Sequence, residues 1–307
     1  MRPMDETANR EVYHTVDEIL GHPAFGRSRR GYVDAILDLY EDDPFLNRLL
    51  IETGRSLTFF NILCLHAAYD EADRATWPTI RRLRATVAPY GVSSARRIHD
   101  LVARLIETGY VTAHTAPLDR RVRILTPSEK MLAHDRDWLA AFYTPLEIMF
   151  PDPGYAYAIR RDPAFQKAQR AVALQLSGLS AQFLKDNPVI LFFMGREAGM
   201  MILMKLVQLS LQSPDGLAEF TSFADIGERF GVSRTHVRSL LREAERMDLV
   251  RIFDGGVRLM SVLLAAFDRF LADTMSGHDI LYMKAAHNLE KLHEGGAQFG
   301  QASPPSL

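Results

Sequence analysis

The sequence has little cysteine, since Cys64 is the single thiol among 307 residues. One cysteine cannot build a disulfide framework or a thiolate zinc site, and the ten histidines are scattered, so we expect no metal site. The glycine-containing segment 195–199 lacks the spacing and the Lys-Ser/Thr of a phosphate loop. We therefore expect neither an enzyme nor a bound cofactor.

Long apolar runs are also lacking. The most apolar stretch, residues 189–206, is interrupted by Arg196 and Glu197, whereas a membrane span needs about 20 mainly apolar residues. This pattern predicts a buried helix and no membrane partner. The charged N-terminus has no apolar signal-peptide core, which favours a cytoplasmic location.

Charge is unevenly distributed, although the net charge is only −2. Residues 78–124 hold nine arginines, no lysine and three acidic residues, a net charge of +6. Residues 222–259 have a net charge of +1, so the rest of the chain carries −9. A basic island in an otherwise acidic chain indicates a polyanionic partner.

Two segments of the chain align with each other. Residues 91–111 and residues 231–250 both begin with Gly-Val-Ser, and one extra residue near Ser93 absorbs the difference in register. Apolar residues then coincide at three pairs of positions: Ile98 with Val237, Leu101 with Leu240, and Val102 with Leu241. We interpret this self-similarity as an internal duplication.

The second copy has the pattern of a helix-turn-helix. Ser222 and Asp225 are spaced as a capping box, Gly231 suits a sharp helix end, and Ser233 can cap the next helix. Apolar residues repeat on the inner face, which leaves a polar outer face suited to phosphates and base edges. The DNA contacts predicted in this copy are Ser233, Arg234, Thr235, His236, Arg238, Ser239 and Arg242.

The first copy repeats this order with a more basic outer face. A short helix is expected to present three arginines outward, and a helix over about 94–107 follows the turn. The DNA contacts predicted on these two helices are Arg81, Arg82, Arg84, Ser94, Arg96, Arg97 and Arg104. A longer helix is expected before each pair, over about 56–69 and about 189–211.

A β-hairpin is expected after each helix pair. Asp254-Gly255 is a strong turn signal between two short β-prone runs in the second copy. The first hairpin carries three further predicted DNA contacts, Arg120, Arg121 and Arg123. After it, Thr126 is predicted to cap the next helix, with Pro127 at its first position and Glu129 at its third.

These strings resemble two families of winged-helix regulators. Asp119-Arg120-Arg121 followed by Leu125-Thr126 resembles the wing of MarR-type regulators, and residues 231–238 with Leu241-Arg242-Glu243 are similar to the recognition helix of GntR-type proteins. The resemblance covers about 45 residues in each half and implies an operator-DNA partner. It implies that Arg120 or Arg121 enters the minor groove, and that the major groove or its phosphates are contacted by Arg234, Thr235, His236 and Arg238. The wing is shorter than usual in MarR-type proteins, and Asp248 replaces a usual glycine.

The expected fold is therefore mainly α with short β-hairpin wings, as two tandem winged helix-turn-helix domains related by internal duplication. The expected boundaries are an N-terminal segment 1–30, a first domain 31–150, a second domain 151–294 and a flexible tail 295–307. The expected function is that of a sequence-specific, double-stranded DNA-binding transcriptional regulator. Two alternatives stay open, a plasmid-type replication initiator and a winged-helix scaffold that binds protein.

Two further partners also stay open. Related regulators usually bind as homodimers, but here the two units of one chain can form a pseudo-dimer that reads an asymmetric site. The Met- and Phe-rich run 192–204 is interpreted as core or dimer interface, with a small-molecule effector pocket as the alternative.

Overall fold

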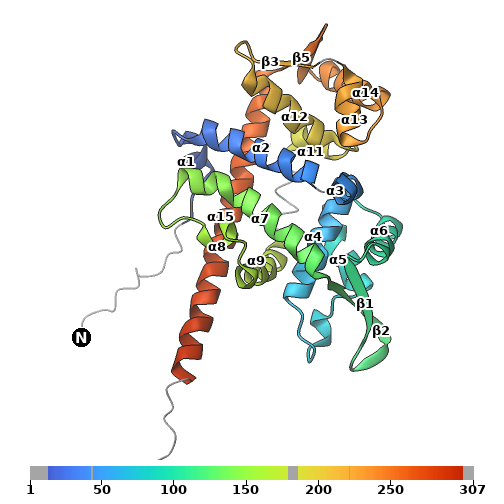
Figure 1. Ribbon diagram of the computed structural model, residues 1–307, viewed down its shortest axis with the longest axis vertical. Helices are drawn as coiled ribbons and strands as arrows, with labels where there is room; N and C mark the ends of the chain where they lie inside the picture. Colours follow the sequence, from blue (N-terminus) through green and yellow to red (C-terminus); the bar gives the residue numbers. More distant parts are fainter. Residues whose placement is uncertain (1–12, 43, 179–185, 221, 300–307) are drawn as a thin grey trace, which may run out of the picture.

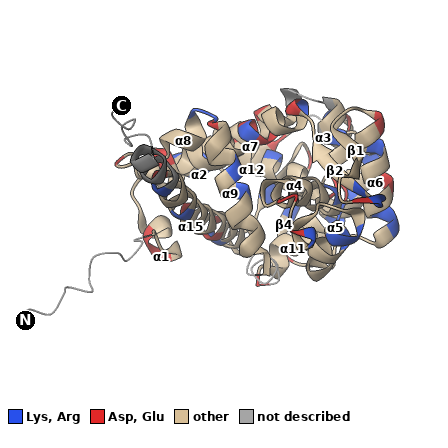
Figure 2. Cartoon of the chain, turned by 90° about the horizontal axis from the view of Figure 1, so that it is seen from below, with Lys and Arg blue, Asp and Glu red and all other residues tan. Residues whose placement is uncertain are grey.

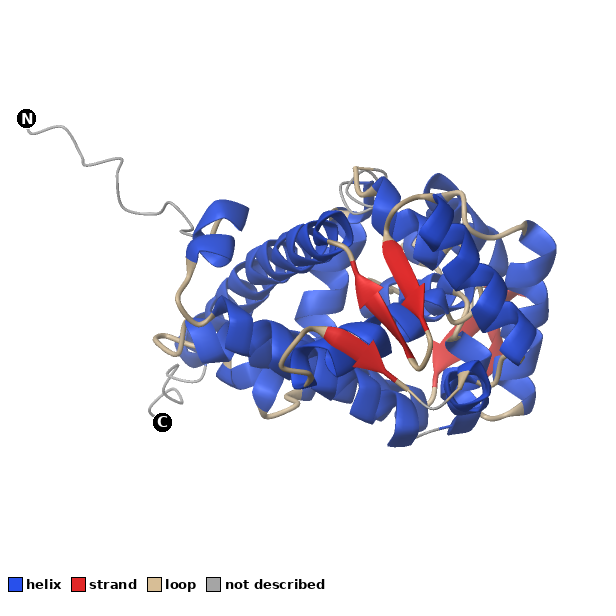
Figure 3. Cartoon of the chain, turned by 90° about the horizontal axis from the view of Figure 1, so that it is seen from above, coloured by secondary structure: helices blue, strands red, loops and turns tan. Residues whose placement is uncertain are grey.

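The computed structural model describes residues 13–42, 44–178, 186–220 and 222–299. It is mainly helical, with two small antiparallel sheets (Figures 1 and 3). The first part of the chain forms α1 (Val16–Gly21), α2 (Phe25–Asp42), α3 (Pro44–Leu50), α4 (Thr53–Ala67), α5 (Ile80–Val87), α6 (Ala95–Glu107), β1 (Val111–Ala116), β2 (Asp119–Pro127) and α7 (Glu129–Met149).

The second part of the chain repeats much of this order. It forms α8 (Ala156–Ile159), α9 (Pro163–Gln175), α11 (Pro188–Met194), α12 (Gly199–Gln212), β3 (Leu217–Glu219), α13 (Phe223–Phe230), α14 (Arg234–Arg246), β4 (Val250–Phe253), β5 (Gly256–Leu259) and α15 (Ser261–Phe299). β1 pairs with β2, and the second sheet has the order β3-β5-β4. The helix pairs α5–α6 and α13–α14 are thus each followed by a hairpin and a long helix.

The two hairpins are joined to their neighbours by the same backbone hydrogen bonds. In each half, the backbone N–H of the residue before the hairpin donates to a carbonyl of the preceding helix. The carbonyl of the same residue accepts from the backbone N–H of the residue after the hairpin. The bonds are Tyr110 N to Leu105 O (2.9 Å) and Ser128 N to Tyr110 O (2.8 Å) in the first copy, and Leu249 N to Ala244 O (3.0 Å) and Met260 N to Leu249 O (3.0 Å) in the second.

Most of the predicted helix caps are present. The side chains of Ser94 and Ser233 cap α6 and α14, and Ser222 forms a capping box with Asp225 at α13. The predicted start of α7 is wrong, because Ser128 caps this helix. Thr126 and Pro127 instead end β2, where they pair with Thr112 and Val111.

The single helix expected over residues 189–211 is also wrong, because the chain breaks between α11 and α12. Ala198 has a left-handed backbone with φ of 55°. A Cβ on Gly199 would lie 2.1 Å from the carbonyl oxygen of Phe193. Only glycine allows the start of α12 to approach the end of α11 so closely.

The packing of the long helices links the two parts of the chain. α2 packs against α7 and also against α12, whereas α9 packs against α15 and also against α4 (Figure 1). α2 thus contacts α7, which ends the first half, and α12, which precedes the helix pair of the second half. α9 likewise contacts α15, which ends the second half, and α4, which precedes the helix pair of the first half. The two halves therefore pack against each other through these helices and are not separate domains joined only by a linker.

Two ion pairs cross between the halves in a matching way. Arg170 of α9 reaches Asp135 of α7 with Nη2–Oδ1 and Nε–Oδ2 distances of 2.5 and 3.0 Å, and both residues are buried. Arg29 of α2 reaches Asp268 of α15 at 2.7 Å and is half-buried. A buried pair is costly to break, since removal of one partner leaves an uncompensated charge.

The buried apolar residues form a smaller and a larger core. A smaller core lies among α3, α4, α5, α6, β1 and the start of α7, and includes Phe59, Leu83 and Ile98. A larger core joins α2, α7, α9 and α15 to the second helix pair. The expected boundary 30/31 falls inside α2, 150/151 falls between α7 and α8, and 294/295 falls inside α15. Residues 1–12 and 300–307 lie outside the described residues.

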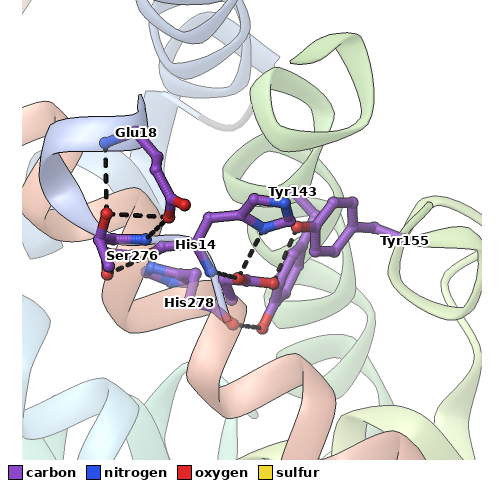
Figure 4. Close-up of polar contacts among 8 residues, drawn as sticks. His14, Glu18, Tyr143, Tyr155, Ser276 and His278 are labelled. Atoms are coloured by element: carbon purple, nitrogen blue, oxygen red, sulfur yellow. Dashed lines mark hydrogen bonds and ion pairs between the residues drawn. The ribbon is translucent and has the colours of Figure 1, made fainter. Parts of the chain in front are cut away.

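The segment before α1 is held on α15 by a buried carboxylate (Figure 4). Asp279 is 1% exposed and accepts from the backbone N–H of His14 (2.6 Å) and from the hydroxyl of Tyr155 (2.8 Å). The ring Nδ1 of His14 lies 3.0 Å from the same carboxylate, and Ser276 donates to the His14 carbonyl (2.8 Å). These contacts fasten the N-terminal segment to the last helix.

Candidate nucleic-acid interface

The first helix pair is set by a cap, a turn and an apolar inner face. Thr79 caps α5, Ser94 caps α6, and Gly91 between them has φ of 68°, which favours glycine. Leu83 and Ile98 are buried between the two helices. The opposite face of α6 is therefore presented to solvent.

Three arginines predicted as DNA contacts project from α6, and each has an acidic neighbour. Arg96 lies 3.7 Å from Asp100, Arg97 lies 2.8 Å from Glu52, and Arg104 lies 3.1 Å from Glu107. The arginine side chains are 92%, 63% and 52% exposed, respectively. Exposed ion pairs contribute about 0–1 kcal/mol, so phosphates can compete for these guanidinium groups.

The arginines of α5 differ in exposure. Arg81 is exposed, as predicted, but Arg82 and Arg84 are half-buried. The Nη1 atom of Arg82 and the Nε atom of Arg84 are buried without a hydrogen-bond partner among the described residues. Burial lowers the pKa of Arg82, with a smaller opposing effect of Asp73. The outward orientation expected for all three thus holds fully for Arg81 alone.

The β1–β2 hairpin carries a cationic tip. Arg120 and Arg121 are exposed, and the side chain of Arg120 makes no hydrogen bond or ion pair with any residue that the structure describes. Arg121 pairs with Asp119 at 3.4 Å. The pKa of Asp119 is lowered, first by the hydrogen bond from the Arg121 backbone N–H and also by the Arg121 and Arg74 side chains. Arg123 folds back onto the Ala113 carbonyl.

The second helix pair has a tighter turn. Gly231 has φ of 70°, and a Cβ on Gly227 would lie 2.5 Å from the carbonyl oxygen of Val232. The backbone of the turn therefore lies so close to α13 that position 227 has room only for a glycine.

Most of the residues predicted as contacts on α14 are exposed. Ser233, Arg234, Thr235, Arg238 and Ser239 are exposed, and neither Arg234 nor Arg238 has an ion pair within the described ranges. Arg242 lies 3.7 Å from Glu245. His236 is half-buried, and its Nε2 lies 2.8 Å from the Glu197 carbonyl, so this ring is engaged within the protein.

The β4–β5 hairpin is shorter than the first, and its cations are paired. Its turn is at Asp254-Gly255, as the sequence predicts. Arg251 lies 3.4 Å from Asp248, and Arg258 lies 3.3 Å from Asp215. This hairpin offers less free positive charge than the β1–β2 hairpin.

The two helix pairs lie on the same side of the molecule. Along the right side of Figure 1, the β4–β5 hairpin is followed by α14, then by α6 and then by the β1–β2 hairpin. Figure 2 shows basic positions along α5 and α6 at this side. The elements that carry the exposed arginines of the two helix pairs thus lie along one side of the molecule in this view.

Other ligand sites are less developed. No cluster of metal-ligating side chains occurs among the described residues, and no helix in this part of the chain is both long and apolar enough to cross a membrane. The Met- and Phe-rich run 192–204 packs in or against the larger core. A cavity of about 170 Å³ lies elsewhere, between α4, α7 and α9, and its lining includes His66, Arg136, Gln166 and Lys167.

Comparisons with protein-family models, with curated proteins and with solved structures found no match. The functional conclusion therefore depends on the geometry of this chain alone.

Proposed function

We propose that the chain is a sequence-specific, double-stranded DNA-binding transcriptional regulator. In this proposal, α5–α6 and α13–α14 are two helix-turn-helix units whose hairpins act as wings, and the two units arose by internal duplication. α6 and α14 are the recognition helices. The observation that carries the proposal is that α6 and α14 lie along the same side of a single chain in Figure 1, and that each is followed by a β-hairpin.

The duplication is supported by details that sequence similarity alone would not require. The two copies share left-handed glycines at the helix turns, serine caps on α6 and α14, and the backbone bonds that join each hairpin to its neighbours. The matching contacts of α2 and α9 also support this duplication, because each of these helices packs against both halves. We propose that this arrangement is a pseudo-dimer within one chain, which resembles the way dimeric regulators present two recognition helices.

The two units differ in charge and therefore in expected role. The first unit offers Arg81, Arg96 and the exposed Arg120 of its long hairpin, which suit phosphates and a minor groove. The second unit offers Arg234 and Arg238 with the hydroxyl groups of its helix, which suit base edges as well as phosphates. Because the exposed residues of the units differ, the DNA site should be asymmetric.

Selection from a random duplex library with the full chain tests this function. The proposal predicts enrichment of one motif with two unequal half-sites. A palindromic motif would contradict the pseudo-dimer and favour two chains that each use one unit. If no duplex is retained at low salt, DNA binding is refuted and a protein-binding scaffold is favoured. Mapping of the motif to promoters or to a replication origin separates a regulator from a replication initiator.

A further inference from the structure

The corner between α3 and α4 touches both helix pairs. On one side, Arg97 Nη1 of α6 lies 2.8 Å from Glu52 Oε1, at the residue before α4. A Cβ on Gly54 would lie 2.6 Å from the carbonyl oxygen of Val92 in the first helix turn. The backbone of the loop between α5 and α6 therefore packs directly against the first turn of α4.

The same corner also contacts the second half. The Thr53 hydroxyl donates to the carbonyl oxygen of Met194, the last residue of α11, at 2.8 Å. The side chain of Arg48 packs over Gly231, in the turn between α13 and α14. Its Nε would lie 3.2 Å from a Cβ added at Gly231. Adjacent residues of one corner thus engage α6 on one side and α11 and the α13–α14 turn on the other.

The loop after α11 completes the connection to α14. Arg196 reaches both carboxylate oxygens of Glu243, with distances of 2.6 and 3.3 Å, and also donates to the Phe192 carbonyl (2.6 Å). His236 Nε2 donates to the Glu197 carbonyl at 2.8 Å. The proposed recognition helix α14 is therefore held on this loop at two points, His236 in its first turn and Glu243 in its third turn.

We propose that these contacts form a bridge that fixes the separation of α6 and α14, so that the chain selects DNA with a single half-site spacing. The bridge runs from the backbone of Val92, before α6, through Gly54 and Thr53 to Met194, and then through Arg196 to Glu243. This inference rests on the proposed function, because spacing has meaning only for a protein that reads two half-sites.

The geometry of DNA makes the selection strict. One inserted base pair moves a half-site by about 3.4 Å along the duplex and rotates it by about 34°. A direct hydrogen bond weakens sharply beyond about 3.2 Å, so a bridge of such bonds cannot lengthen by that amount without breaking. Domains joined by a flexible linker would instead move relative to each other and tolerate several spacings.

The test uses the full chain and duplexes in which the two selected half-sites are separated by the selected spacing or by one to three base pairs more or fewer. The wild-type chain should lose at least about tenfold in affinity for each one-base-pair change, the size of a single mismatched contact. The variant Thr53→Val with Arg196→Gln removes two links of the bridge and neither residue is a predicted DNA contact. It should bind the selected spacing with little change and the altered spacings several-fold more tightly than the wild type does.

The matched control is Thr144→Val with Arg30→Gln. It removes a threonine hydroxyl that donates to Ala140 within α7 and an exposed arginine of α2, and it should keep the wild-type spacing profile. Circular dichroism melting of each variant verifies the fold. Equal affinity of the wild type for all spacings, or identical profiles of wild type and bridge variant, would overturn the bridge alone. Failure to bind any spacing would refute the proposed function and the bridge with it.

Discussion

Gly109 lies between α6 and β1, and Asp248 occupies the matching position between α14 and β4; both have a left-handed backbone conformation. Their φ angles are 74° and 55°. Glycine adopts this conformation without strain, whereas a side chain with a Cβ does so at a cost, and aspartate is among the residues that tolerate it best. The first copy has the residue that the geometry favours, and the second copy has a tolerated substitute.

This relationship predicts opposite effects of two substitutions on stability. Gly109→Ala should lower the free energy of unfolding by about 1 kcal/mol through backbone strain alone, because no heavy atom lies within 4 Å of the added Cβ. Asp248→Gly should raise it by about 0.5 kcal/mol, since relief of strain exceeds the added freedom of glycine in the unfolded chain. Urea unfolding measures both. Shifts in the same direction would contradict the shared conformation.

The break between α11 and α12 predicts a larger effect at Gly199. Gly199→Ala should destabilise the fold by about 3 kcal/mol, because its Cβ would lie 2.1 Å from the Phe193 carbonyl oxygen, which is backbone and cannot rotate away. Gly21→Ala is the control, since Gly21 ends α1 with nothing within 4 Å of an added Cβ. Thermal melting should show a marked decrease for the first variant and little change for the second. Equal melting temperatures would indicate that α11 and α12 are arranged differently.

His278 predicts a dependence of stability on pH. Its ring stacks on Phe142 with centroids 4.7 Å apart, and its Nδ1 lies 2.8 Å from the Thr274 carbonyl. Burial lowers the pKa of His278 to about 4, with a smaller contribution from Arg170. The unfolded chain, with a histidine pKa of about 6.5, therefore binds the proton first as the pH falls. The free energy of unfolding should therefore decrease by about 3 kcal/mol as the pH falls from 6.5 to 4.

Urea unfolding at pH 7, 5.5 and 4.5 measures this contribution. The variant His278→Phe keeps a ring against Phe142 but cannot take up a proton, so its stability should fall less than that of the wild type over this range. Parallel pH profiles of the two proteins would show that His278 is not neutral and buried in the fold.

The proposed role of α14 in DNA readout predicts two base-specific effects. Arg234→Ala and Arg238→Ala should each reduce affinity for the selected motif by about 1–3 kcal/mol and relax the preference at one base position. Arg30→Ala, at an exposed position of α2, is the control and should leave the motif unchanged. Selection from the random library with each variant provides the measurement. An unchanged motif for both Arg234 and Arg238 variants would remove the second unit from DNA readout.

Local elements of the fold could be predicted from the sequence because their signals are local. The serine caps, Gly231 and the Asp254-Gly255 turn each act within a few residues of themselves, and the structure has them where the sequence predicts them. Thr126-Pro127 was ambiguous, since the same residues suit a helix start and the end of a strand. The pairing with β1 makes these residues part of the strand, and their partners Thr112 and Val111 lie 14 and 16 positions earlier in the sequence.

Packing between distant segments could not be predicted in this way. Periodicity assigns Arg82 and Arg84 to an outer face, but it does not show that neighbouring elements half-bury them. His236 has the position of a DNA contact, yet its ring bonds to Glu197, which lies 39 residues earlier. The crossing of α2 and α9 between the halves likewise gives no local signal, because any amphipathic helix has a face to bury and the sequence does not name its partner.

The salt dependence of duplex binding, measured by fluorescence anisotropy with the full chain, tests most directly whether this chain binds DNA through its arginines. If about six phosphates are neutralised, affinity should fall about 10³-fold between 50 and 200 mM salt. The Arg120→Ala, Arg121→Ala double variant should weaken binding to all sequences alike and reduce the slope by about two. No binding at 50 mM salt, or an affinity that does not change with salt, would contradict the account of this chain as a two-unit DNA reader.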